Sequence, residues 1–301
     1  MFTRPKIGLA LGGGGARGLA HIGVIKVLER EHIPIHIITG TSAGAVIGGM
    51  YAQNPSIDVV EHKMRAFLSG KDFKKTGIEH ANQKPPGENF FKQLAENLKE
   101  RLMINIACSR ISLVANKRLQ VALFALLENG NIEETAIRFG ALSSDLVTGK
   151  SVLCETGDII QAIMASASLP GFLPPLENDD QKLIDGVVTD PIPVKAAFSM
   201  GADVVIAVDV STDLNIQKRF DNIVDVVMRN NQITGHFYKE LLLENADVVI
   251  RPEVGAFHWS EFDKIDIIIE KGAIAALKVV SALKSITRRR IRFNKKSFQL
   301  S

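Results

Sequence analysis

The 301-residue sequence predicts an α/β fold, built as one doubly wound domain around a mostly parallel sheet. Short apolar runs alternate with stretches of helical periodicity along the chain, which is the pattern of successive strand–helix units. Apolar residues make up 46% of the sequence, which is enough for a single large core. A glycine-rich loop between the first buried strand and the first helix adds a third indication of this fold class.

The predicted elements follow this alternation in order. Strands are expected at residues 6–11, 35–39, 137–146, 150–154, 181–184, 203–209 and 246–250. Helices are expected at residues 17–30, 43–53, 56–69, 88–106, 116–128, 157–168, 193–200, 219–243 and 267–286. Residues 70–87, which include the run Lys84-Pro85-Pro86-Gly87, are predicted to form a mobile loop.

The loop after the first strand reads Gly12-Gly13-Gly14-Gly15-Ala16-Arg17-Gly18. Without Cβ atoms, consecutive N–H groups at a helix N-terminus can point into one concavity and stabilise an oxyanion or a phosphate. The loop also matches Gly-x-Gly-x-x-Gly, but no carboxylate that could hold a ribose lies between Glu31 and Asp58. An oxyanion site is therefore favoured over a nucleotide site, and a purely structural turn is a third interpretation.

A second motif, Gly40-Thr41-Ser42-Ala43-Gly44, follows the apolar run His36–Thr39 and precedes a helix of small residues. The small neighbours Gly40 and Gly44 allow a sharp strand-to-helix turn that leaves the Ser42 Oγ accessible to a carbonyl group. Taken alone the motif is weak, because many such runs are ordinary turns. In this context it predicts a serine nucleophile.

No histidine is placed as the base for this serine. Pro34 prevents His32 and His36 from sharing a helix face, and His21 is interpreted as a packed helix residue. Asp185, at the end of a short strand before Gly186, is the candidate base. Asp209, at the end of another strand, is the rival and is interpreted mainly as structural.

Together, the Gly12–Gly18 loop, the Gly40–Gly44 turn, the Ala165–Pro175 stretch and Asp185-Gly186 resemble the patatin-like phospholipases of the short bacterial type. The resemblance implies a three-layer α/β/α fold and a Ser–Asp dyad without histidine or any metal or other cofactor. It implies that Ser42 is the nucleophile and Asp185 the base, and that the oxyanion hole is formed by Gly13, Gly14 and Gly15. The supporting positions that it implies are Arg17, Gly18, Gly40, Gly44 and Gly186.

The resemblance also implies a patatin-like domain over residues 7–198, with residues 199–286 completing the same globular unit and 287–301 as a basic tail. The expected activity is hydrolysis of phospholipid or other lipid esters through an acyl-enzyme. One departure is Val187, where the family usually has glycine or alanine. It supports an alternative, a catalytically weak regulatory or scaffold protein that binds acyl or anionic ligands.

Composition and charge bear on partners and location. Cys108 and Cys154 share no metal or redox spacing, and no signal peptide or spanning segment is evident, so a cytoplasmic protein is expected. Phe90, Leu94, Leu98 and Leu102 give an amphipathic pattern that fits either a lipid-touching lid or a packed helix. Seven basic residues between Lys284 and Lys296 fit either a contact with the inner face of a membrane or a solvated tail. No nucleic-acid partner is expected, and the oligomeric state is left open.

Overall fold

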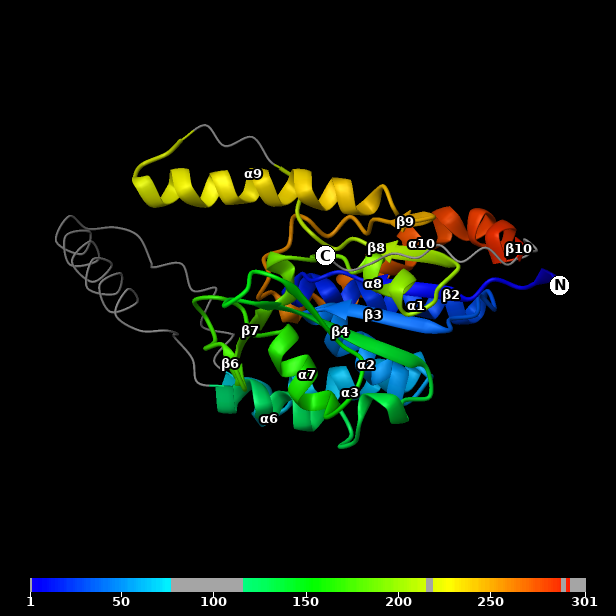
Figure 1. Cartoon of the computed structure of the whole chain (residues 1–301), viewed down its shortest axis with the longest axis horizontal. Coiled ribbons are helices and arrows are strands. Elements are labelled where there is room, and N and C mark those ends of the chain that lie inside the picture. Colours follow the sequence, from blue (N-terminus) through cyan, green and yellow to red (C-terminus); the bar gives the residue numbers. More distant parts are fainter. Residues whose placement is uncertain (1, 77–115, 215–218, 288–290, 293–301) are drawn as a thin grey trace.

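The computed structural model describes residues 2–76, 116–214, 219–287 and 291–292 (Figure 1). Within these residues, eight strands form the main sheet in the order β6-β7-β4-β3-β2-β8-β9, and β5 pairs with β4. Their bounds are β2 Ile7–Leu11, β3 Ile37–Thr41, β4 Arg138–Asp145, β5 Ser151–Cys154, β6 Leu176–Asn178, β7 Gln181–Asp185, β8 Val204–Val208 and β9 Val248–Ile250. The short strands β1 (Phe2–Thr3) and β10 (Ile291–Arg292) pair separately.

The strands β4, β3, β2, β8 and β9 run parallel to one another. On the β4 side of the sheet, β5 and β7 each pair antiparallel with β4, and β6 pairs antiparallel with β7. Leu11 pairs with both Gly40 and Val208, so the loops after β2, β3 and β8 emerge at one edge of the sheet. Asp185 pairs with Ser143, near the end of β4, and reaches the same edge from the opposite direction. Carboxyl edges of parallel strands are where sites form in α/β proteins.

Helices cover both faces of this sheet, which makes three layers (Figure 1). On one face, α1, α2, α3, α6, α7 and α10 enclose the larger apolar cluster, and α8 with the end of α9 covers a smaller cluster on the other. The helices are α1 Ala20–Arg30, α2 Ala43–Gln53, α3 Ile57–Ser69, α4 Lys71–Thr76, α6 Asn116–Leu126, α7 Ile159–Ser166, α8 Val194–Ser199, α9 Ile223–Leu243 and α10 Ile265–Thr287.

The α/β class and the mostly parallel sheet are confirmed, and each of the seven predicted strands is found within a few residues of its expected bounds. One expectation is wrong: α4 occupies the first part of the predicted loop, because Phe73 is buried and packs edge-on against Phe67 and Phe262. The strand β6 was not expected. The predicted helix 88–106, Cys108, the rest of the loop and nearly all of the basic tail lie outside the described residues.

Among the helices of the described ranges, none is both long enough and apolar enough to cross a membrane.

Candidate active site

Ser42 sits in the turn between β3 and α2 with φ 54° and ψ −121°, a conformation that is rare for a residue with a side chain. The turn closes only because its neighbours are glycines. A Cβ at Gly40 would lie 2.5 Å from the Gly44 carbonyl oxygen, and one at Gly44 would overlap the carbonyl of Leu11. The Ser42 N–H donates to Ser166 Oγ at 3.0 Å, which anchors the turn to α7.

Asp185 ends β7 and is almost completely buried. Its carboxylate accepts a hydrogen bond from the Val187 N–H at 2.9 Å. Burial raises the pKa of Asp185 to about 6, and the nearby Ser42 hydroxyl and the Val187 N–H act against that rise. The structure therefore places Ser42 and Asp185 together in one cavity and makes the carboxylate a better proton acceptor than an ordinary aspartate.

The glycine loop lies beside this pair. A Cβ at Gly13 would be 3.3 Å from the Ser42 Cβ, so the two backbones are in close contact. However, the Gly13 N–H donates to the Pro191 carbonyl at 3.1 Å and is not free to receive an oxyanion. Within the described part of the chain, the N–H groups of Gly14 and Gly15 have no acceptor. Of the three backbone N–H groups predicted as oxyanion donors, only those of Gly14 and Gly15 are therefore available in this structure.

The positions expected to support the loop lie around it. Gly15 has φ +59°, and a Cβ there would lie 2.5 Å from the Trp259 carbonyl oxygen. A Cβ at Gly18 would lie 2.5 Å from the Cβ of Ala43, at the start of α2. The Arg17 guanidinium donates to the Phe257 carbonyl at 3.4 Å, which links the loop to the segment before α10. Gly186 passes directly against the Leu142 carbonyl, where a Cβ would not fit.

His21 is fully buried, as expected of a packed helix residue, but it also makes a specific contact. Its Nε2 lies 2.8 Å from the Gly12 carbonyl oxygen. Burial lowers the pKa of His21 to about 4, so the ring is neutral near pH 7. A carbonyl only accepts, so the proton is on Nε2, and the buried Nδ1 has no partner among the described residues.

Asp209, the rival carboxylate, is engaged in an ion pair. Its carboxylate lies 3.0 Å from the Lys239 Nζ and accepts the Ser211 N–H at 2.9 Å. Burial alone would raise its pKa, but the Ser211 hydrogen bonds and the Lys239 charge hold the pKa of Asp209 below its ordinary value. This arrangement agrees with the structural interpretation of Asp209.

Ser42, Asp185 and the glycine loop open onto one cavity of about 440 Å³. Its walls are almost entirely apolar and come from α2, α3, α4 and α6 on one side and from the Leu169–Leu173 and Trp259–Phe262 segments on the other. Phe172 and Trp259 meet edge to face at its rim, with ring centroids 5.6 Å apart. Such a cavity suits an apolar chain attached to a polar group at the serine.

Three serines that hold the site were not predicted as site residues. Ser166 Oγ accepts the Ser42 N–H, the Ser168 carbonyl accepts the Asp185 N–H at 2.9 Å, and Ser144 Oγ donates to the Asp185 carbonyl at 3.1 Å. Ser166 and Ser168 lie in the Ala165–Pro175 stretch that carries part of the family resemblance, whereas Ser144 lies in β4. Their hydrogen-bond partners could not be predicted, because only the tertiary fold brings these residues together.

The fold and the site together define an α/β protein in which a serine in a strand-to-helix turn and a buried aspartate line one apolar cavity. The model of the patatin-like phospholipase family matches residues 9–198, so the chain belongs to this family.

Individual relatives agree with this family membership. The lysophospholipase NTE1 of Coccidioides immitis is 34% identical over 204 residues, which are 68% of this chain and 11% of that protein. An uncharacterized NTE family protein of Mycobacterium tuberculosis is 32% identical over 212 residues, which are 69% of this chain and 50% of that protein. The chain thus spans half or less of the length of these relatives.

Among solved structures, VipD from Legionella pneumophila is similar with a TM-score of 0.50 and 13% sequence identity. The similarity covers 93% of this chain and 67% of that one, and it shows the fold alone.

Proposed function

We propose that the protein hydrolyses phospholipid or other lipid esters through an acyl-enzyme, with Ser42 as the nucleophile and Asp185 as the base. The observation that carries this proposal is that Ser42, in a strained strand-to-helix turn, and the buried carboxylate of Asp185, with its raised pKa, line the same apolar cavity. Family membership and relatives named as lysophospholipases support the substrate class.

In the first step, Ser42 Oγ attacks the acyl carbonyl carbon and its proton passes to Asp185. Negative charge develops on the former carbonyl oxygen, where the N–H groups of Gly14 and Gly15 stabilise it. Each well-placed donor contributes about 3 kcal/mol to such a transition state. The bond to the alcohol then breaks, and the leaving alkoxide takes the proton from Asp185.

In the second step, a water molecule gives a proton to Asp185 and attacks the acyl-enzyme carbonyl. The bond to Ser42 breaks, the proton returns to Ser42 Oγ, and the carboxylic acid leaves. Val187 does not disturb this scheme, because its backbone N–H supports the Asp185 carboxylate and its side chain is partly exposed at the cavity rim.

A fluorophosphonate probe and a series of esters test the proposal. We expect the wild-type protein to be labelled and to hydrolyse lysophosphatidylcholine and p-nitrophenyl esters, and we expect Ser42→Ala to abolish both signals. Ser211→Ala is the matched control, because Ser211 lines the same cavity and should not be needed for labelling. Labelling that survives Ser42→Ala would exclude Ser42. A wild-type protein that binds fatty acid without labelling or turnover would favour a binding protein instead.

A further inference from the structure

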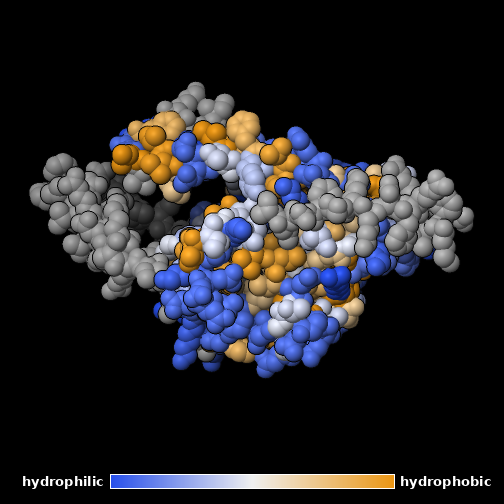
Figure 2. Space-filling view, in the orientation of Figure 1, coloured by the Kyte–Doolittle hydropathy of each residue, from blue (hydrophilic) through white to orange (hydrophobic). Residues whose placement is uncertain are grey.

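Among the described residues, the helix α9 packs against the body of the protein near its C-terminal end. Its buried residues are Lys239, Leu242 and Leu243, and the Tyr238 hydroxyl donates to the Thr189 carbonyl at 2.7 Å. No described residue between 223 and 237 is buried, and α8 is its main packing partner among the described elements. The N-terminal part of α9 extends beyond the body of the protein (Figure 1), and an opening separates the two in the space-filling view (Figure 2).

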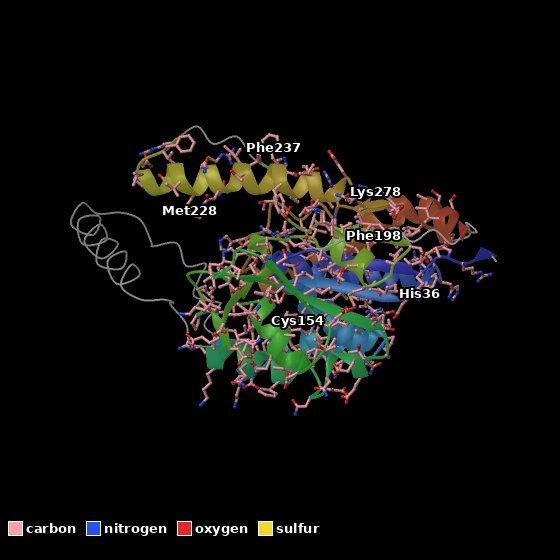
Figure 3. The ribbon with its side chains drawn as sticks, viewed as in Figure 1. His36, Cys154, Phe198, Met228, Phe237 and Lys278 are labelled. Atoms are coloured by element: carbon pink, nitrogen blue, oxygen red, sulfur yellow. The ribbon has the colours of Figure 1, made fainter. Side chains whose placement is uncertain are left out.

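The side of α9 that faces away from the body is apolar. Phe237 projects outward and Met228 projects from the opposite side of the helix (Figure 3). The exposed fractions are large, 78% for Ile223 and 68% for Phe237. We call this outward face the α9 stripe; it consists of Ile223, Val226, Val227, Asn230, Ile233, Phe237 and Leu241.

The spacing within the α9 stripe is that of a helix–helix seam. Ile223, Asn230 and Phe237 repeat at intervals of seven residues, and so do Val226 and Ile233. A seven-residue apolar repeat keeps one seam facing a second helix, and a single asparagine within such a seam is a common device for specifying the pairing. Helices in proteins are stabilised mainly by packing of an apolar face, and residues 223–237 of α9 have no such packing against the described part of the chain.

Charge distinguishes a protein partner from a lipid surface. Between Arg219 and Glu244 the chain has four acidic and three basic residues, and the buried Lys239 is paired with Asp209. Helices that lie on anionic membranes are instead rich in exposed lysine and arginine. The α9 stripe itself has no charged member, so an identical stripe can face it without like-charge repulsion.

We propose that the α9 stripe is a homodimer interface, in which α9 of one chain packs against α9 of a second copy about a two-fold axis. An isologous pair of this kind needs only one self-complementary surface, and cyclic dimers are the commonest oligomers. The exposed apolar residues of α9 are then covered in the assembly, as extended apolar patches on soluble proteins generally are. Within each chain, α9 also contacts the segment that follows Asp185, because the Tyr238 hydroxyl donates to the Thr189 carbonyl.

Light scattering after size-exclusion chromatography of the full chain tests this interface. At micromolar concentration the wild type should have about twice the chain mass of 32.8 kDa. The double variant Val227→Glu with Phe237→Glu should have the mass of one chain, because each interface would then hold four buried carboxylates. Leu277→Glu is the matched control, since Leu277 is a comparably exposed apolar residue on α10, and it should remain dimeric.

Circular dichroism should show that the monomeric double variant keeps the helices and strands of the body. A wild-type protein with the mass of one chain throughout the micromolar range overturns the proposal, and so does a double variant that stays dimeric. Flotation with phosphatidylcholine vesicles, with and without phosphatidylglycerol, separates the lipid alternative. A monomeric wild type whose vesicle binding is lost in the double variant would assign the stripe to a membrane instead.

Discussion

The Asp185 side chain has opposite effects on stability and on catalysis. Its pKa rises from the ordinary value of 3.8 to about 6 because burial disfavours the ionised form. Since the folded-state pKa is raised, ionisation at neutral pH destabilises the folded protein, and this cost disappears below the pKa of the unfolded chain. The same shift brings the carboxylate closer to the proton affinity that a general base needs.

We therefore predict that Asp185→Asn stabilises the protein at pH 7 while reducing acylation and deacylation by at least about 10²-fold. The gain in the free energy of unfolding should be up to about 3 kcal/mol, because one pKa unit corresponds to about 1.4 kcal/mol. It should vanish as the pH falls below about 4, where the Asp185 carboxyl is protonated in both states of the wild type. Urea unfolding as a function of pH and single-turnover kinetics measure both effects.

Asp209→Asn is the matched control at a second buried carboxylate. Its pKa is held below the ordinary value, and its replacement removes the shorter of the two ion pairs of the buried Lys239, which then keeps only Glu240 and the Ser211 hydroxyl, so this variant should lose stability at pH 7. In the wild type, kcat/KM should fall about tenfold per pH unit below pH 6 as Asp185 becomes protonated. An Asp185→Asn protein with near wild-type turnover would remove Asp185 from the mechanism.

At the scale of elements, the loop between β2 and α1 is held from several directions. The Gly12 N–H donates to the Val208 carbonyl at 3.0 Å, and the Ala16 N–H to the Trp259 carbonyl at 2.7 Å. The Gly12 carbonyl accepts from the buried His21. We infer that His21 is a positioning residue for the proposed oxyanion donors, because among the described residues its hydrogen bond goes to Gly12 in the glycine loop and not to Ser42 or Asp185.

We predict that His21→Leu lowers kcat by about tenfold or more with little change in KM, because a displaced oxyanion donor acts in the transition state. His21→Gln should recover most of this loss, since its amide N–H can reach the position of Nε2. Both variants should keep the fall in kcat/KM below pH 6. Loss of that pH dependence would show that His21, rather than Asp185, is the base.

The sequence predicted the elements more completely than the contacts between them. The strands were predicted because each is a short apolar run between polar turns, and the strand-to-helix turn at Ser42 because glycines flank it. The role of Gly13 could not be predicted, since it depends on Pro191, 178 residues further along the chain. The helix α4 was not predicted because four of its six residues are charged and only one, Phe73, is apolar, so its sequence has no apolar periodicity. The ring contacts of Phe73 with Phe67 and Phe262 depend on tertiary packing.

At the scale of the whole molecule, the site depends on chain that lies beyond the family match to residues 9–198. The strand β8 pairs with β2, and the segment that includes Trp259 closes over the glycine loop. The helix α10 lies against α1 at very close range. A Cβ on Gly23 would overlap the Ile269 carbonyl, and a Cβ on Gly272 would overlap the Ala20 carbonyl. Ala20 is the first residue of α1, directly after the glycine loop and its 3-10 turn, Gly15–Leu19.

This crossing predicts opposite effects for the same substitution in two helices. Gly272→Ala should lower the free energy of unfolding by about 1–3 kcal/mol, because rigid backbone atoms of Ala20 must move. Gly235→Ala in α9 should leave stability equal or raise it by up to about 1 kcal/mol, since alanine favours a helix. A Cβ at Gly235 would meet nothing within 4 Å.

Urea midpoints of both variants should be measured with the turnover of a soluble ester. Because the moved backbone at Ala20 adjoins the glycine loop, Gly272→Ala should also lose turnover under conditions in which it is fully folded, whereas Gly235→Ala should not. Equal midpoints and equal turnover for the two variants would mean that α1 and α10 can separate freely. The helix α10 would then cover the core without fixing the geometry of the glycine loop.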